Sequence, residues 1–92
     1  MTFPWLDRTP RSSAAAVKAR LDAQLREVRD RAALYFRLGY KPEDAIARIT
    51  AAIAWEHEAP ASGSGHRPDG LSDAAIADAV RETYARRPGG NL

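Results

Sequence analysis

The stretch that decides the fold is LGYKPEDA, which runs from Leu38 to Ala45. Gly39 directly follows an apolar run, at the position where a helix often ends in a left-handed residue that glycine adopts without steric cost. Three residues later, Pro42 suits the first turn of a new helix, whose N–H groups have no intrahelical partner. Glu43 and Asp44 place negative charge at the positive end of that helix dipole. The stretch therefore predicts two helices joined by a tight turn.

Upstream of this turn, the sequence predicts a long helix over residues 13–38. Ser12 or Ser13 can cap its first turn. Leu34, Phe36 and Leu38 make the helix apolar on several sides near its end, so we expect the last turns to be buried and the earlier, basic turns to project as a half-exposed stalk. Along the whole helix, apolar residues also recur every three or four positions, the spacing of one helix face: Val17, Leu21, Leu25, Val28, Ala32 and Tyr35.

Two further helices are predicted downstream of the turn, over residues 42–58 and 72–86. An apolar stripe marks the first of them, and Ser72 can cap the second. The segment APASGSGHRPDG, residues 59–70, contains Gly, Pro and Ser throughout and is expected to be a flexible loop. The stripes consist of Ile46, Ile49 and Ile53 in one helix and of Ile76, Val80 and Tyr84 in the other.

The predicted fold class is therefore all-α, with a long basic N-terminal helix leading into a small three-helix bundle. The 92 residues allow one small core, and 19 of them are alanine, so the core must be thin. The absence of cysteine excludes disulfides and thiolate metal sites. We expect a single helical domain over residues 12–87, an extended arm over 1–11 and a tail over 88–92.

The arm carries the apolar side chains Phe3, Trp5 and Leu6 between two prolines. Large apolar groups are costly to leave in water, and interfaces are enriched in aromatic residues. Two alternatives stay open: the arm folds back over the domain, or it docks on a partner.

Charge and hydropathy limit the classes of partner. Fourteen basic and twelve acidic residues leave a net charge of +2, too small to dictate a nucleic-acid or membrane partner. No stretch approaches the roughly 18 apolar residues of a membrane span, and the first 13 residues lack the apolar run of a secretory signal. We therefore expect a cytoplasmic protein that does not bind a membrane.

Catalytic and metal-binding patterns are weak. Glu56, His57 and Glu58 are adjacent on a predicted helix, where neighbouring side chains point about 100° apart and cannot converge on one metal ion. The GSG at residues 63–65 lacks the lysine that follows in a phosphate-binding loop. A bundle of this size rarely encloses a substrate pocket. We therefore expect no catalytic residues, no metal and no cofactor.

The basic first helix leaves nucleic-acid binding open. Its cations can neutralise phosphates, but acidic residues alternate with them. The spacings from Asp22 to Arg26 and from Glu27 to Arg31 favour ion pairs within the helix instead. The alternative function is thus a small DNA- or RNA-binding regulator, and its contact residues would be Arg26, Arg29 and Arg37.

The segment LGYKPEDA, followed by LSDAAIADAV from Leu71 to Val80, resembles the C-terminal domain of the RuvA family of bacterial Holliday-junction branch-migration proteins. It is similar more broadly to ubiquitin-associated three-helix modules. The resemblance covers residues 28–87 and implies a ubiquitin-associated-like bundle. It also implies a protein-binding role, since the RuvA domain contacts its AAA+ motor partner. The junction-binding domains of RuvA have no counterpart here, so branch migration itself is not implied.

These observations together favour a non-catalytic protein–protein interaction module, an adaptor or assembly factor whose partner is another protein, such as a larger assembly or an ATPase. Tyr40 could instead be a core residue. A homodimer in which Leu21, Leu25 and Val28 zip the first helix against a second copy is a further alternative. The expected partner-binding residues are Leu38, Gly39, Tyr40, Trp5 and Tyr84.

Overall fold

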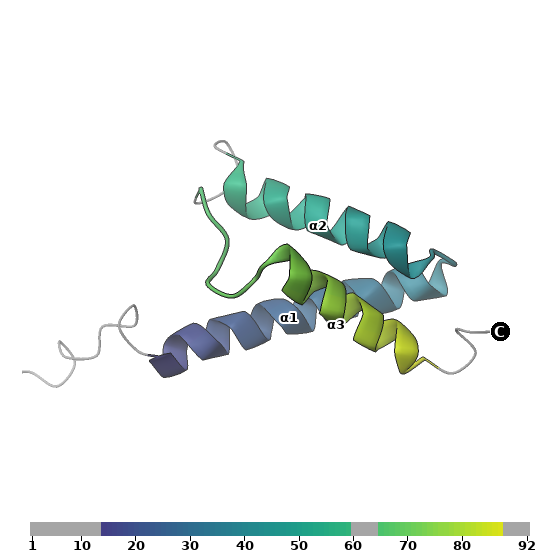
Figure 1. Ribbon diagram of the computed structural model, residues 1–92, viewed down its shortest axis with the longest axis horizontal. Helices are drawn as coiled ribbons and strands as arrows, with labels where there is room; N and C mark the ends of the chain where they lie inside the picture. The colour runs from purple at the N-terminus through teal and green to yellow at the C-terminus, as the bar shows by residue number, and fades with distance from the viewer. Residues whose placement is uncertain (1–13, 60–64, 88–92) are drawn as a thin grey trace, which may run out of the picture.

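The computed structural model describes residues 14–59 and 65–87, which form three α-helices packed into one bundle (Figure 1). Helix α1 spans Ala14–Arg37, α2 spans Pro42–Glu58 and α3 spans Asp73–Ala85. No strand occurs within these residues. The predicted all-α fold with a long first helix is confirmed, and each helix end lies within one residue of its predicted position.

The turn between α1 and α2 has the geometry that its sequence predicts. Gly39 has a φ of +88°. Its N–H donates to the carbonyl of Phe36 at 3.1 Å, and the N–H of Tyr40 donates to the carbonyl of Tyr35 at 3.0 Å. This pair of bonds is the Schellman motif, which satisfies the last carbonyl groups of a helix. The rings of Tyr35 and Tyr40 pack edge to face at 4.9 Å and close the motif with an apolar contact.

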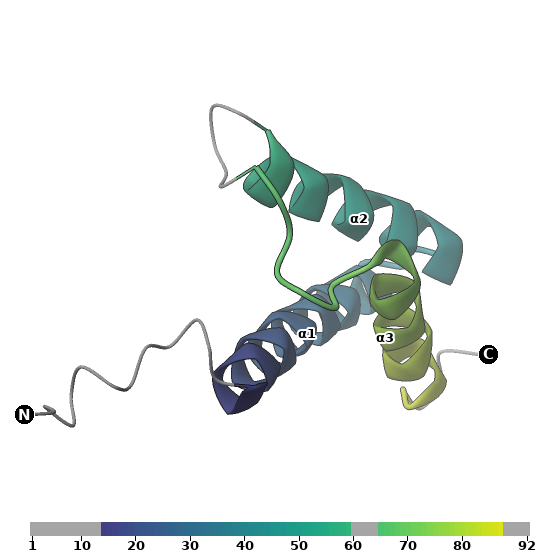
Figure 2. The ribbon, with the colours of Figure 1, turned by 60° about the vertical axis from the view of Figure 1, so that its left-hand side comes forward.

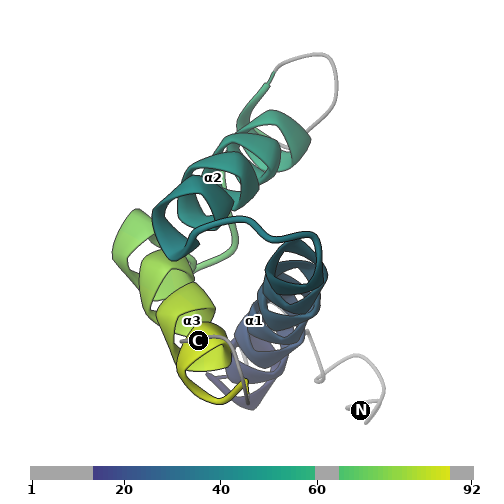
Figure 3. The same cartoon turned by 90° about the vertical axis from the view of Figure 1, so that its right-hand side faces the viewer.

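The three helices surround one small core. Helix α2 runs back along α1 in the opposite direction, and α3 lies beside both and follows the direction of α1 (Figures 1 and 2). Viewed end on, the helices form a triangle (Figure 3). Every helix contributes buried side chains, and so does the connection before α3. The buried core residues are Val28, Ala32, Ala45, Ile49, Ile53, Leu71, Ile76, Ala79 and Val80.

The connection between α2 and α3 is more than a spacer where it is described. From residue 65 onward it crosses toward α1 before α3 begins (Figure 2). Leu71 is only 2% exposed and belongs to the core. Gly70, with a φ of +86°, lies so close to Leu21 that a Cβ atom there would come within 2.8 Å of Leu21 Cδ2. The hydroxyl oxygen of Ser72 accepts a hydrogen bond from the N–H of Ala75 at 3.1 Å, which confirms the predicted cap.

The prediction that the last turns of α1 are buried on several sides was wrong for two residues. Leu34 is 46% exposed and Leu38 is 62% exposed. Helix α1 has only two neighbours in this bundle, and they cover the side that carries Val28 and Ala32. Apolar residues on the other sides of α1 therefore stay in contact with water.

The predicted stalk and the predicted dimer seam are both part of the bundle. Val28 is 1% exposed, and Leu21 and Leu25 are partly buried against the core. The core thus reaches further toward the start of α1 than the sequence indicates. Because these three side chains pack within one protomer, they could zip against a second copy only if the bundle opened.

Candidate functional site

Four of the five residues predicted to bind a partner lie together at one end of the bundle. We call Leu38, Gly39, Tyr40 and Tyr84 the turn surface. The Tyr84 hydroxyl donates a hydrogen bond to the carbonyl of Tyr40 at 2.8 Å and so ties α3 to the turn. Leu38 is largely exposed, and a Cβ atom placed on Gly39 would meet nothing within 4 Å. The fifth predicted residue, Trp5, lies outside the described residues.

Tyr40 is half-buried and shows features of both predicted roles. Its ring packs on Tyr35 of α1. The guanidinium carbon of Arg48, on α2, lies 4.8 Å from the ring centroid, a cation–π arrangement. Tyr40 therefore holds the turn in place and still presents part of its surface to solvent.

Tyr84 is kept as a neutral hydrogen-bond donor. Its ring packs edge to face on Phe36 at 5.3 Å. Burial raises the pKa of the Tyr84 hydroxyl, and the negative charge of Asp44 raises it further. Both effects disfavour the phenolate, so the bond to the Tyr40 carbonyl persists above the pH at which a free tyrosine ionises.

A second set of exposed apolar side chains lies along the α1–α2 hairpin. We call Leu34, Leu38 and Trp55 the hairpin face; their exposed fractions are 46%, 62% and 63%. Leu34 and Leu38 follow Arg31 by three and seven residues, so they lie on the same side of α1. Arg31 reaches across to Glu56 of α2, with Nη2 and Oε2 2.8 Å apart. That side of α1 therefore borders α2.

Trp55 lies along the corresponding side of α2. It follows Arg48 by seven residues, two helical turns, and so shares its side. Arg48 covers Tyr40, whose ring packs on Tyr35 of α1, so this side of α2 borders α1. The sequence analysis did not select Leu34 or Trp55 as contact residues. Their positions could have indicated it: each follows a core residue, Ala32 or Ile53, by two residues, and a side chain two positions further along a helix points away from the buried face.

The basic residues proposed to contact nucleic acid differ in their surroundings. Arg29 Nε lies 3.1 Å from Glu82 Oε1 on α3, so this guanidinium is engaged within the bundle. Arg26 and Arg37 are exposed, and neither pairs with a carboxylate of the described residues. The predicted pair of Glu27 and Arg31 is present at 3.4 Å.

The predicted partner of Asp22 was wrong: Asp22 pairs with Lys18, at 3.0 Å, rather than with Arg26. Both spacings are four residues, and a carboxylate on a helix can lie against the cation on either side of it.

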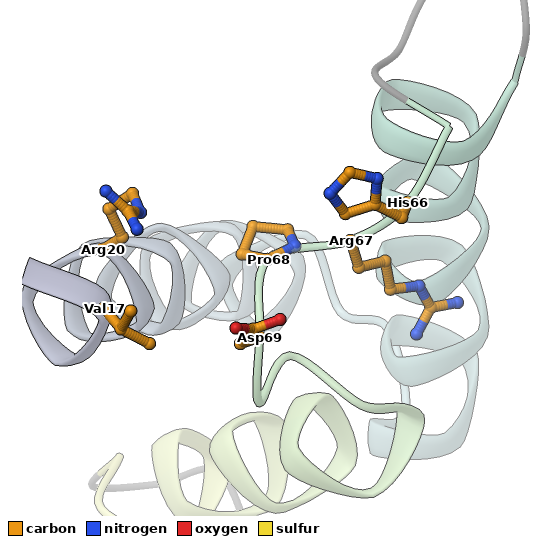
Figure 4. Close-up of a pocket in the computed structure, with 6 residues that line it drawn as sticks. All are labelled: Val17, Arg20, His66, Arg67, Pro68 and Asp69. Atoms are coloured by element: carbon orange, nitrogen blue, oxygen red, sulfur yellow. The ribbon is translucent and has the colours of Figure 1, made fainter. Parts of the chain in front are cut away.

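A shallow hollow of about 150 Å³ lies between the first turns of α1 and the connection that precedes α3 (Figure 4). The Arg67 side chain is turned away from Arg20 in this view and pairs with Glu58 and Asp73. The hydrogen bond to Asp73 raises the pKa of Arg67 against the opposing effect of burial. The charges therefore do not converge on a ligand. The hollow is lined by Val17, Arg20, His66, Arg67, Pro68 and Asp69.

The acidic residues around His57 also diverge. Glu56 pairs with Arg31 on α1, whereas Glu58 pairs with Arg67 in the connection. Within the described ranges, no group of three His, Asp or Glu side chains is placed to hold a metal ion.

Comparison with known proteins adds no assignment: no family model, curated protein or solved structure matches the chain. Among the helices of the described residues, none is long and apolar enough to cross a membrane.

Proposed function

We propose that this chain is a non-catalytic protein–protein interaction module that acts as an adaptor or assembly factor of a larger complex. The observation that carries the proposal is Leu38, which is 62% exposed on a turn whose backbone is fixed by the bonds of Gly39 and Tyr40. A large apolar side chain on a rigid support costs little entropy when a partner covers it. Removing its exposed apolar surface from water also favours binding.

Two further observations support the turn surface as the contact region. The open space beside Gly39 lets a partner approach the backbone closely. The similarity of residues 38–45 to the corresponding turn of RuvA C-terminal and ubiquitin-associated modules agrees with this location, because those modules bind partner proteins at or near that turn. It suggests a larger assembly or a motor ATPase as the kind of partner.

The test is affinity capture with the immobilised full chain from an extract of the source organism. Leu38→Ser removes the anchor. Gly39→Asn places a side chain in the open space while retaining a residue that tolerates a positive φ. Leu34→Ser is the matched control, since it makes the same change one turn away and outside the turn surface. We expect Leu38→Ser and Gly39→Asn to reduce capture of a specific partner at least tenfold, and Leu34→Ser to retain it. A partner captured equally by all three variants would disprove the assignment.

A second candidate function is nucleic-acid binding, which one observation favours. Arg26 and Arg37 are exposed and lie eleven residues apart, close to three full turns, so both project from one side of α1. Titration with nonspecific DNA at rising salt tests this: phosphate neutralisation gives a slope of roughly −0.9 per contact. The double variant Arg26→Glu/Arg37→Glu should then abolish binding. Failure of the wild type to bind at low salt rejects the candidate.

A further inference from the structure

We propose that Asp69 is a site of spontaneous modification: when the turn that contains it opens, the backbone nitrogen of Gly70 attacks the Asp69 side chain and converts the residue to isoaspartate. Asp69 is the one aspartate of the chain that precedes a glycine. Glycine has no side chain to hinder the approach of its nitrogen, and its backbone turns easily. The other six aspartates precede alanine or arginine; they are Asp7, Asp22, Asp30, Asp44, Asp73 and Asp78.

The carboxylate of Asp69 is accessible for this reaction. It is exposed and lines the shallow hollow beside α1 (Figure 4). It forms no hydrogen bond or ion pair with the described residues. The nearby guanidinium of Arg67 is engaged by Glu58 and Asp73 instead. Among the described residues, therefore, no side chain holds the Asp69 carboxylate away from the Gly70 nitrogen.

The backbone of the closed turn, in contrast, blocks the reaction. The N–H of Leu71 donates to the carbonyl of Pro68 at 3.1 Å and closes a β-turn with Asp69 and Gly70 at its centre. The φ angle is +86° at Gly70 and is not positive at Asp69, so the turn is of type II. Its second residue has a ψ of about +120°, which points the next nitrogen away from the side chain. Ring closure needs both on the same side, so the turn must open first.

The reaction needs no reagent except water. A bond forms between the Gly70 nitrogen and the side-chain carbon of the protonated Asp69 carboxyl group. The C–O bond of that group breaks, and its hydroxyl leaves as water with the amide proton, so that a five-membered succinimide ring remains. Water then adds to one ring carbonyl. Addition at the former peptide carbonyl gives isoaspartate, and addition at the other restores aspartate. One water is lost and one is gained, so the mass does not change.

Isoaspartate lengthens the main chain by one atom between residues 69 and 70, where the connection has no room for it. A Cβ atom on Gly70 would already come within 2.8 Å of Leu21 Cδ2. Leu71 is only 2% exposed and is fixed in the core. A longer backbone cannot keep Gly70 against α1 and Leu71 in the core at the same time. The modification therefore weakens the attachment of the connection to α1. This inference goes beyond the proposed adaptor function and does not depend on it.

Prolonged incubation of the full chain at neutral pH, followed by peptide mapping with electron-transfer fragmentation, tests the inference. This fragmentation cleaves the isoaspartyl backbone at a diagnostic bond and so locates isoaspartate without a change in mass. We expect isoaspartate at residue 69 and not at the other six aspartates. Asp69→Glu is the control and should remove the signal, because a six-membered ring forms far more slowly. Isoaspartate that is absent from residue 69, or equally frequent at all the aspartates, overturns the inference.

A comparison of rates tests whether the closed turn restrains Asp69. The wild type should form isoaspartate roughly tenfold or more faster in denaturing urea than in buffer. In buffer, Arg67→Met should accelerate the reaction several-fold, because it removes the ion pairs that join the connection to both helices. Arg20→Met is the matched control, since Arg20 lines the same hollow and is exposed. Its rate should equal that of the wild type.

Intermediate urea concentrations provide the same test without a substitution. The rate in the wild type should rise step by step as urea opens the connection, and circular dichroism of each sample reports whether the helices are retained. Equal rates in buffer and in denaturing urea would show that the turn does not restrain Asp69 and would overturn the inference. Equal acceleration in Arg67→Met and Arg20→Met would overturn it as well. None of these outcomes alters capture of a partner by Leu38 and Gly39, so the adaptor function is tested separately.

Discussion

At the scale of single residues, Gly39 and Gly70 share one backbone conformation but differ in their surroundings. Their φ angles are +88° and +86°. A Cβ atom on Gly39 would meet nothing, whereas one on Gly70 would lie 2.8 Å from Leu21 Cδ2. Gly39→Ala should therefore cost only the backbone strain, about 1–2 kcal/mol of unfolding free energy. Gly70→Ala should cost more, because the connection must also move away from α1. Urea denaturation measures both.

A double-mutant cycle separates the two contributions at Gly70. If the contact with Leu21 causes the additional loss, Gly70→Ala should cost less in a Leu21→Ala background than in the wild type. The residual cost should then approach that of Gly39→Ala. Equal costs for Gly70→Ala in both backgrounds would show that the connection does not press on α1.

The Tyr84 hydroxyl provides the hydrogen bond that joins α3 to the turn. Tyr84→Phe keeps the ring against Phe36 and removes the bond to the Tyr40 carbonyl. The expected loss is about 1 kcal/mol of unfolding free energy, the usual net value of such a bond. Tyr35→Phe is the control: the Tyr35 hydroxyl makes no hydrogen bond with the described residues, so its removal should change stability far less. Thermal and urea denaturation should rank the variants in this order.

The raised pKa of Tyr84 makes stability fall in alkali. Above the ordinary tyrosine value of about 10 the unfolded chain loses the phenol proton, while the folded protein retains it. The unfolded state then binds fewer protons, so the unfolding free energy decreases as pH rises through the folded pKa. Below pH 10 this contribution is fully present. Urea denaturation between pH 9 and 11 should show a steeper decline for the wild type than for Tyr84→Phe; parallel declines would contradict the assignment.

At the scale of elements, Arg67 links the end of α2 to the start of α3. Its guanidinium pairs with Glu58, the last residue of α2, and with Asp73, the first residue of α3, and donates to the carbonyl of Leu71. The Arg67 side chain is 18% exposed, but the carboxylates of Glu58 and Asp73 are 45% and 73% exposed, so water partly screens both pairs. Arg67→Met should cost about 1–2 kcal/mol of unfolding free energy. Arg67→Lys should lose nearly as much unfolding free energy as Arg67→Met, because an ammonium group cannot offer the planar set of donors that a guanidinium has.

Limited proteolysis tests whether the loss of stability in Arg67→Met is located in the connection between α2 and α3. In Arg67→Met the segment of residues 65–73 should unfold locally more often. A protease should therefore cleave it several-fold faster than in the wild type. Arg20→Met is the control, since Arg20 is exposed and its removal leaves both helix ends joined. Equal acceleration in the two variants would assign no linking role to Arg67.

The helices could be predicted from the sequence because their ends depend on local chemistry. Gly39 specifies the end of α1 and Pro42 the beginning of α2 through their own backbone preferences. Ser72 specifies the start of α3 through its own hydroxyl. The packing of the connection against α1 could not be predicted, because Gly70 approaches Leu21 across 49 positions of the chain. A local sequence pattern cannot indicate a contact between residues so far apart in the chain.

At the scale of the whole molecule, the sequence could predict a residue of the candidate site only where a local sequence signal, such as a turn, also places that residue on the surface. Gly39 belongs to the turn itself, so the sequence places it at a surface, whereas Leu38 was expected to be buried and is 62% exposed. The exposure of Leu34 and Trp55 depends on how many neighbours each helix has, which only the assembled bundle determines. In this bundle both side chains lie two positions after a core residue and remain exposed.

The small core makes the three helices depend on one another. Ile49 is among the largest fully buried side chains. Ile49→Ala should cost about 3 kcal/mol, whereas a bundle of this size rarely exceeds roughly 3–5 kcal/mol of unfolding free energy. We therefore expect all three helices of the variant to be near the midpoint of unfolding at 25 °C. Leu34→Ala is the matched control, because Leu34 is 46% exposed, and its cost should stay within about 0.5 kcal/mol.

Two probes of the same urea titration establish whether the loss is cooperative. Far-ultraviolet circular dichroism follows every helix, and Trp55 fluorescence in a Trp5→Phe background follows α2 alone. If all helices share one core, the two transitions coincide in the wild type and shift together in Ile49→Ala. Separate transitions, or a cost below about 1 kcal/mol for Ile49→Ala, would mean that α2 is not needed to hold α1 and α3 together. In that case the α1–α2 hairpin would not be a rigid support for the turn surface.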